Sequence, residues 1–190
     1  MTKIIAFALA GLASLATPVF AAPGPPTKLV VIDKVAIMQG SKVGQDVARQ
    51  VQAIATQAKN DLTAQGQALQ AEGRALQQQV AILAPDAKAK RLSAFQAKER
   101  ALQSAAQKKD EQIKAGFYQA RQAMEQALGP ILQEVIKEKG ANIVVDKQAV
   151  VFATANSFDI TAEVINRLNQ KMPTYKVNLN APPAPAQPRQ

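Results

Sequence analysis

An apolar stripe at helical spacing runs through the middle of the chain. From Ser41 it steps by four or three residues through Val43, Val47, Val51, Ile54 and Ala58. It then continues as a leucine at every seventh position: Leu62, Leu69, Leu76 and Leu83. Apolar residues at these intervals share one face of an α-helix, in the manner of a coiled coil. We therefore predict a long amphipathic helix over residues 41–84.

A second long helix is predicted to begin at the Ala84-Pro85-Asp86 sequence and to end near residue 139. Proline disfavours the α conformation at the residue before it but suits the first turn of a new helix. The apolar stripe of this second helix consists of Leu92, Phe95, Leu102, Ala106, Ile113, Phe117, Met124, Leu128, Leu132 and Val135. The first helix, and the part of the second helix before Gly129, would each be about 65 Å long at 1.5 Å per residue. Matched lengths joined by a tight turn predict an antiparallel hairpin that projects beyond the rest of the chain.

Glycine and proline interrupt this predicted hairpin at three places. Gly66 and Gly73 stand where the second core residue of a heptad would stand, and each costs a helix about 1 kcal/mol relative to alanine. We therefore expect a weak, flexible seam in the middle of the arm. Pro130 has no N–H group to donate, so Gly129-Pro130 is expected to interrupt and kink the second helix. This pair is either a hinge that lets the arm swing or a fixed kink at its root, and we favour the hinge.

Short runs of β-branched residues on either side of the hairpin predict strands. Residues 28–33 carry apolar side chains at successive positions, which indicates a strand buried on both faces. Residues 142–146 and 149–153 predict two more strands. Asp159 is expected to cap a last helix, which Pro173 ends.

These elements predict an α+β fold that is mostly helical. A hairpin arm of residues 41–129, with its tip near residues 84–86, would project from a small β body of residues 28–40 and 130–172. The expected core of this body, which also serves its assembly, consists of Leu29, Val30, Val31, Ile32, Ile143, Val144, Val145, Val150, Val151 and Phe152.

The first 21 residues have the pattern of a secretory signal peptide. Lys3 gives a positive start, residues 4–15 are apolar, and Val19 and Ala21 form a small-x-small cleavage site. We expect cleavage between Ala21 and Ala22 and export of the rest. The apolar run is shorter than the roughly 20 residues that a membrane-spanning helix needs.

Proline-rich stretches flank the predicted body. Residues 22–27 form a stiff lead-in that cannot be helical. Residues 173–190 contain Pro182, Pro183, Pro185 and Pro188. We expect these last 18 residues to form a disordered tail.

The composition leaves few routes to catalysis. The chain has no histidine, cysteine or tryptophan, which excludes histidine–cysteine zinc sites, thiol nucleophiles and Ser-His-Asp triads. No P-loop sequence is present. Asp33, Asp146 and Asp159 fit capping and turn roles better than a metal site. We expect a protein that is not an enzyme and has no cofactor.

The chain has a net charge of +9, and cationic side chains are frequent in the second helix of the arm. Between residues 86 and 114, four acidic side chains stand against eight cationic ones: Lys88, Lys90, Arg91, Lys98, Arg100, Lys108, Lys109 and Lys114. This set is either an electropositive surface that attracts acidic proteins or lipid phosphates, or an ordinary solvated helix with i,i+4 ion pairs.

Aromatic and methionine side chains of the arm suggest a division between packing and exposure. Helical spacing favours packing within the hairpin for Phe95, Phe117 and Met124, whereas Tyr118, rotated by about 100° from its neighbour, is expected to be exposed. Two further aromatic residues are expected in the body core: Phe152 and Phe158.

The order of these features resembles the Skp/OmpH family of outer-membrane-protein chaperones. The similarity is most specific in residues 129–132, 135–146, 148–153 and 159–168, which read GPIL, VIKEKGANIVVD, QAVVFA and DITAEVINRL. The resemblance implies a periplasmic homotrimer whose three arms enclose a cavity for unfolded outer-membrane proteins, held without ATP. It further implies lipopolysaccharide or anionic lipid as partners, with no catalytic residue to assign.

Two other classes of function fit parts of the same pattern. A coiled-coil adaptor or spacer of the cell envelope would use the arm as a docking surface, although the glycines argue against a rigid ruler. Nucleic-acid binding would fit a pI near 9.9, but export and the lack of a groove-binding motif argue against it. We expect no specific nucleic-acid partner.

Overall fold

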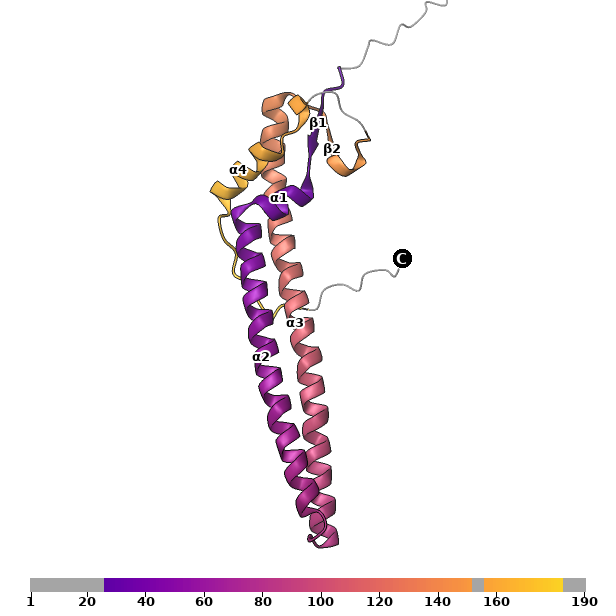
Figure 1. Ribbon diagram of the computed structural model, residues 1–190. Coiled ribbons are helices and arrows are strands. Elements are labelled where there is room, and N and C mark those ends of the chain that lie inside the picture. The colour runs from indigo at the N-terminus through magenta and orange to yellow at the C-terminus, as the bar shows by residue number, and fades with distance from the viewer. Residues whose placement is uncertain (1–25, 152–155, 183–190) are drawn as a thin grey trace, which may run out of the picture.

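The structure is a computed structural model that describes residues 26–151 and 156–182. It consists of a long two-helix arm with a small body at one end (Figure 1). The predicted signal peptide, most of the lead-in and Phe152 lie outside the described residues. Within the described ranges, none of the helices has an apolar run that is long enough to cross a membrane.

The body contains a two-stranded parallel sheet. Strands β1 (Leu29–Ile32) and β2 (Ile143–Asp146) pair in register from Leu29 opposite Ile143 to Ile32 opposite Asp146. Both strands were predicted, and the burial of β1 on successive positions confirms its expected place in the core. On its other side β1 makes a single bridge, between Val31 and Asp159.

The predicted third strand is wrong for the residues that the structure describes. Lys147–Ala149 form a short 3-10 helix, η1, and neither Val150 nor Val151 belongs to a strand. The side chain of Asp146 accepts a hydrogen bond from the backbone N–H of Gln148 at 3.1 Å. Such a local side-chain contact turns the backbone away from the straight path that a strand requires.

A helix that was not predicted, α1 (Lys34–Gly40), directly follows β1. Asp33 caps it by accepting a hydrogen bond from the N–H of Ala36 at 2.8 Å. Ser41 then caps helix α2 (Lys42–Gln79) through the N–H of Gly44 at 3.1 Å. A Cβ at position 44 would lie 1.6 Å from the carbonyl oxygen of Met38, so glycine is required where α1 turns into α2.

Helices α2 and α3 (Pro85–Lys139) form the predicted antiparallel hairpin, joined by residues 80–84. With 55 residues, α3 is about 82 Å long. Gly140 ends it in the left-handed conformation, with φ of 63°. The predicted interruption at Pro130 is wrong, because α3 runs through it without a break. Leu128 and Ile131 are buried on either side, and their packing holds the helix together despite the missing N–H group.

The hydrophobic core lies where the arm meets the body. Helix α4 (Thr161–Lys171) packs there against α1 and α3. Its first turn follows Asp159, whose side chain accepts from the N–H of Thr161 at 2.9 Å. The largest fully buried side chains at this junction are Ile37, Val43, Ser41, Met124, Ile131, Val135, Val164 and Leu168. Toward the tip the packing becomes sparse: between residues 85 and 114, α3 has no buried side chain.

The C-terminal segment corrects the expectation of a disordered tail. Residues 173–182 leave α4, run along α2 and cross to α3 (Figure 1). Val177 in this segment is buried, and Tyr175 and Leu179 pack against the core. The prolines at positions 173 and 182 therefore bound a packed segment with a turn at residues 179–180, and of the predicted tail only residues 183–190 lie outside the described part of the chain.

Candidate functional site

The surface of the arm carries the side chains singled out for function. Three of the eight predicted cations are engaged within the hairpin. Lys98 lies 2.6 Å from a carboxylate oxygen of Glu72 across the two helices, and Arg91 donates to the side-chain oxygen of Gln79. Lys114 pairs with Asp110 one turn away at 2.6 Å, and this hydrogen bond raises the pKa of Lys114 above its ordinary value.

The other five cations make no ion pair within 4.0 Å among the described residues: Lys88, Lys90, Arg100, Lys108 and Lys109. All but Lys109, which is half-buried, are exposed. Each of the two interpretations of the basic helix therefore holds for some of its cations and not for others. Lys114 has the i,i+4 ion pair of an ordinary helix and Lys98 pairs with Glu72 on the facing helix, whereas the five cations without ion pairs leave their charge available to an anionic partner.

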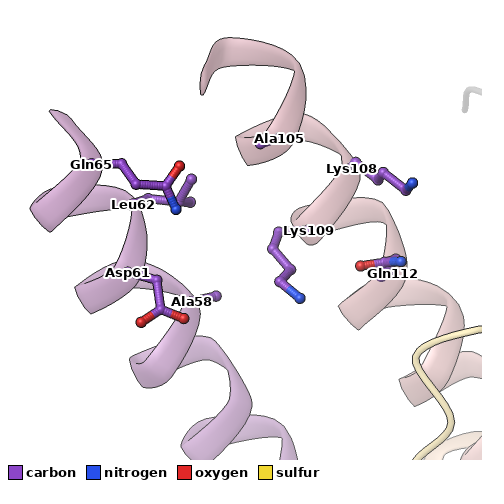
Figure 2. A pocket seen from close by; sticks show the side chains of 8 residues that line it. All are labelled: Ala58, Asp61, Leu62, Gln65, Ala105, Lys108, Lys109 and Gln112. Carbon is purple, nitrogen blue, oxygen red and sulfur yellow. The ribbon is translucent and has the colours of Figure 1, made fainter. Parts of the chain in front are cut away.

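A groove of about 290 Å³ with a mixed polar and apolar lining lies between the helices in the middle of the arm. Figure 2 shows its lining residues. The side chain of Lys109 lies in the space between the two helices, whereas that of Lys108 points away from α2. Asp61 itself accepts a hydrogen bond from Gln57 at 2.8 Å. The remaining lining residues are Ala58, Leu62, Gln65, Ala105 and Gln112. A lining of small, amide and charged side chains suits loose polar contact rather than a shaped site.

A larger groove of about 480 Å³ lies closer to the tip and is more apolar. Its apolar lining consists of Gly73, Leu76, Val80, Leu92 and Phe95. Two exposed cations, Arg74 and Lys88, complete it together with Gln70 and Gln77. An apolar floor with cations beside it can receive an amphipathic segment that carries acidic groups.

The aromatic residues of the arm partly reverse their predicted roles. Met124 is buried and Phe95 half-buried, as expected, but Phe117 is 47% exposed. Tyr118, predicted to be exposed, is half-buried and accepts a hydrogen bond from Gln122 at 3.1 Å. The reason is that the small side chains of Ala115, Gly116 and Ala120 form the buried face of this part of α3. The run of small residues at positions 115, 116 and 120 is the sequence signal for this buried face.

The predicted body core is only partly enclosed within one chain. Val30, Val31 and Ile32 are buried, and four others are half-buried: Leu29, Val144, Val145 and Val150. Ile143 is 42% exposed and Val151 is fully exposed, so neither lies in the core of the single chain. Phe158, also predicted as core, is 46% exposed.

Two of the three aspartates considered for a metal site are helix caps: Asp33 caps α1 and Asp146 caps η1. Asp159, predicted as the N-cap of α4, lies one residue before the observed N-cap Ile160; it accepts from the N–H of Thr161 and from Nζ of Lys147, each at 2.9 Å. Over residues 26–151 and 156–182, no group of three histidine, cysteine, aspartate or glutamate side chains is placed to hold a metal ion. Gly129 and Pro130, the candidate hinge, lie on α3 where a Cβ on Gly129 would meet open space.

Comparison with known proteins assigns this architecture to a family. The family model described as outer membrane protein (OmpH-like) matches residues 28–168, well over half of the chain. The chain belongs to the OmpH-like family. A crystal structure of a protein from Caulobacter crescentus CB15, assigned as an outer membrane chaperone (OmpH-like), is similar with a TM-score of 0.75 and 25% identity. The similarity covers 84% of this chain and 95% of that one. Comparison with curated proteins gives no match.

Membership of the OmpH-like family supports a chaperone role and agrees with a mostly helical fold on a small sheet. The matched range includes the whole arm and most of α4. It stops before the C-terminal segment that crosses the OmpH-like arm, so residues 173–182 are a feature that the family match does not explain.

Proposed function

We propose that this chain is an ATP-independent holdase chaperone of the periplasm, which binds unfolded outer-membrane proteins and prevents their aggregation. The observation that supports this most is the arm. It is about 82 Å long along α3, its distal seam is sparsely packed, and its surface has two open grooves of different polarity. Such a surface offers many weak contacts, which suits clients that share no single shape.

The contacts would combine charge and apolar surface. Five cations without ion pairs would attract an unfolded client over a distance, and attraction of this kind weakens with salt. Exposed apolar side chains along the arm would then hold it: Ile82, Leu92 and Phe117. No nucleotide enters this scheme, because capture and release both follow from weak contacts at equilibrium.

A homotrimer is proposed because the body is incomplete as a single chain. A two-stranded sheet is marginal by itself, and an open strand edge invites pairing with another chain. Ile143 on β2 and Val151 after η1 expose apolar surface that copies of the same body would cover. Cyclic assembly of three bodies would place the arms around a common cavity.

Export and lipid partners remain part of the proposal. Export with cleavage near Ala21 and Ala22 would deliver the chain to the periplasm, which unfolded outer-membrane proteins cross. Lipopolysaccharide or anionic lipid is proposed as a second partner because Lys88 and Lys90 near the tip, and Arg100 farther along α3, are unpaired cations among the described residues.

Light scattering tests the holdase. A urea-unfolded outer-membrane β-barrel protein is diluted into buffer without nucleotide, with and without a stoichiometric amount of this chain. We expect scattering to be suppressed, and suppression to weaken at high salt. Unchanged scattering, together with binding of folded partners only, would instead favour an envelope adaptor or spacer.

A further inference from the structure

The C-terminal segment is seated on the arm in a way that resembles peptide recognition. It lies beyond the residues matched by the family, and it crosses from α2 to α3 (Figure 1). Its described part, residues 173–182, has neither helical nor strand structure, so its place is set by contacts with the two helices.

The sequence of the segment alternates. Tyr175, Val177 and Leu179 are apolar and face the core, whereas the residues between and after them are polar and exposed: Lys176, Asn178 and Asn180. A period of two is the pattern of an extended strand with one buried face, which residues 175–178 can follow before the turn at residues 179–180. Transmembrane β-strands of outer-membrane barrels have the same alternation of apolar and polar side chains.

One glutamine of α2 binds the backbone of this segment at two points. The side-chain nitrogen of Gln50 donates to the carbonyl oxygen of Tyr175 at 2.7 Å, and its side-chain oxygen accepts from the N–H of Val177 at 3.0 Å. Asp46 orients the amide by accepting from the same nitrogen at 2.8 Å. Main-chain bonds two residues apart are what a neighbouring strand would provide, and they do not depend on the side chains of the bound segment.

We call the surface of α2 and α3 that the segment covers the seat, and on α3 it contains a glycine, Gly116. A Cβ on Gly116 would lie 2.8 Å from a methyl carbon of Val177 and 2.9 Å from the carbonyl oxygen of Asn178. The absence of a side chain at this position lets the extended segment approach the helix, and Val177 is only 7% exposed as a result. The seat therefore combines backbone recognition by Gln50 with a close approach of the segment to the backbone of Gly116.

We propose that this seat is a docking site for extended, alternating segments of unfolded outer-membrane proteins, and that residues 175–179 occupy it as an internal stand-in. The inference rests on the proposed function, which supplies the class of ligand. A client would displace the segment, so the segment would lower the affinity of the arm for the client. In the absence of clients, it would keep the apolar site covered.

Thiol labelling tests the displacement, because the chain has no cysteine of its own. Val177→Cys places a single buried thiol in the segment, and Asn178→Cys places an exposed one beside it. With a cysteine-free, urea-unfolded β-barrel protein as the probe, we expect labelling of Val177→Cys to become at least ten-fold faster, with little change for Asn178→Cys. If the client is held in solution while Val177→Cys stays as slow as in the free protein, the inference is wrong and the holdase stands.

A second pair of variants measures the effect on capture. Val177→Asp places a charge in the buried site and should release the segment without altering Gln50 or Gly116. Asn178→Asp adds the same charge at the exposed neighbour. We expect the unfolded β-barrel protein to bind several-fold more tightly to Val177→Asp than to Asn178→Asp. Equal or weaker binding to Val177→Asp would show that the segment only stabilises the arm. If the unmodified chain does not suppress aggregation of the β-barrel protein, the proposed function itself is contradicted.

Discussion

The ring of Phe95 lies over the backbone of Gly73, where a Cβ would come within 3.0 Å of the ring carbon Cζ. From the sequence, Gly73 is a gap in the seam of the hairpin. In the structure the gap is filled from the opposite helix by an aromatic ring. Gly66 differs, because a Cβ there would make only an ordinary contact with Leu102 at 4.0 Å. The two glycines therefore have different roles at equivalent heptad positions.

Alanine substitutions should separate these two glycines. Gly66→Ala is expected to raise the free energy of unfolding by up to about 1 kcal/mol, because alanine favours the helix and meets no obstacle. Gly73→Ala should give a smaller gain or a loss, because the ring of Phe95 must move. Urea unfolding at equal protein concentration measures both. Equal gains in the free energy of unfolding would show that the position of the Phe95 ring does not depend on the absence of a side chain at Gly73.

The turn from α1 into α2 should be far less tolerant. Gly44→Ala would place a Cβ 1.6 Å from the backbone oxygen of Met38, and neither backbone can move without opening the core. We expect a loss of about 3 kcal/mol or more, near the upper end for single substitutions. Thermal unfolding of Gly44→Ala beside Gly66→Ala provides the comparison. A loss below about 1 kcal/mol would contradict the described geometry.

Gly129→Ala tests the proposed hinge. A Cβ at this position meets open space, so the substitution should fold normally and stiffen α3 beside Pro130. With spin labels attached at Ala81→Cys near the tip, the distribution of tip-to-tip distances in the proposed trimer should become narrower. Gly66→Ala serves as the control. Distributions of equal width with and without Gly129→Ala would show a fixed junction.

Acid should weaken the contact between α3 and α4. The hydrogen bond from Arg167 lowers the pKa of Glu138, and hydrogen bonds from Lys139 and Arg167 lower the pKa of Glu163. A carboxyl group whose pKa is lower in the folded state stabilises the fold above its unfolded pKa, and this stabilisation is lost as the pH falls through the folded value.

The loss should therefore begin near pH 4.5, the ordinary value for glutamate, and grow below it. Because these groups are exposed, the effect should be small and should shrink with salt. Urea midpoints between pH 7 and pH 3 are expected to fall less steeply for Arg167→Met than for the unmodified chain. The same pH dependence in both would exclude this ion-pair cluster as a cause.

Local signals in the sequence predict the long elements well. The apolar stripe and Pro85 place the hairpin, and Gly140 places the end of α3. The same local rules predict a break at Pro130 that does not occur, because the buried neighbours Leu128 and Ile131 hold the helix. Packing of distant segments thus outweighs one missing hydrogen bond.

The seat of the C-terminal segment could not be predicted from local rules. Its partners, Gln50 and Gly116, are far from Val177 in the sequence and carry no motif. Proline content suggested disorder, and the alternation of Tyr175, Val177 and Leu179 was the only local sign of an extended, half-buried segment. Of the candidate surface, the basic helix was predicted, but which cations are paired depends on the facing helix.

Mass photometry of the mature chain, alone and with an unfolded outer-membrane β-barrel protein, tests the central claim most directly. The proposed holdase predicts a mass of three copies for the chain alone. With the client and without nucleotide, it predicts a discrete complex heavier by the mass of the client. A chain that remains a monomer, or whose mass is unchanged while the client aggregates, would contradict it.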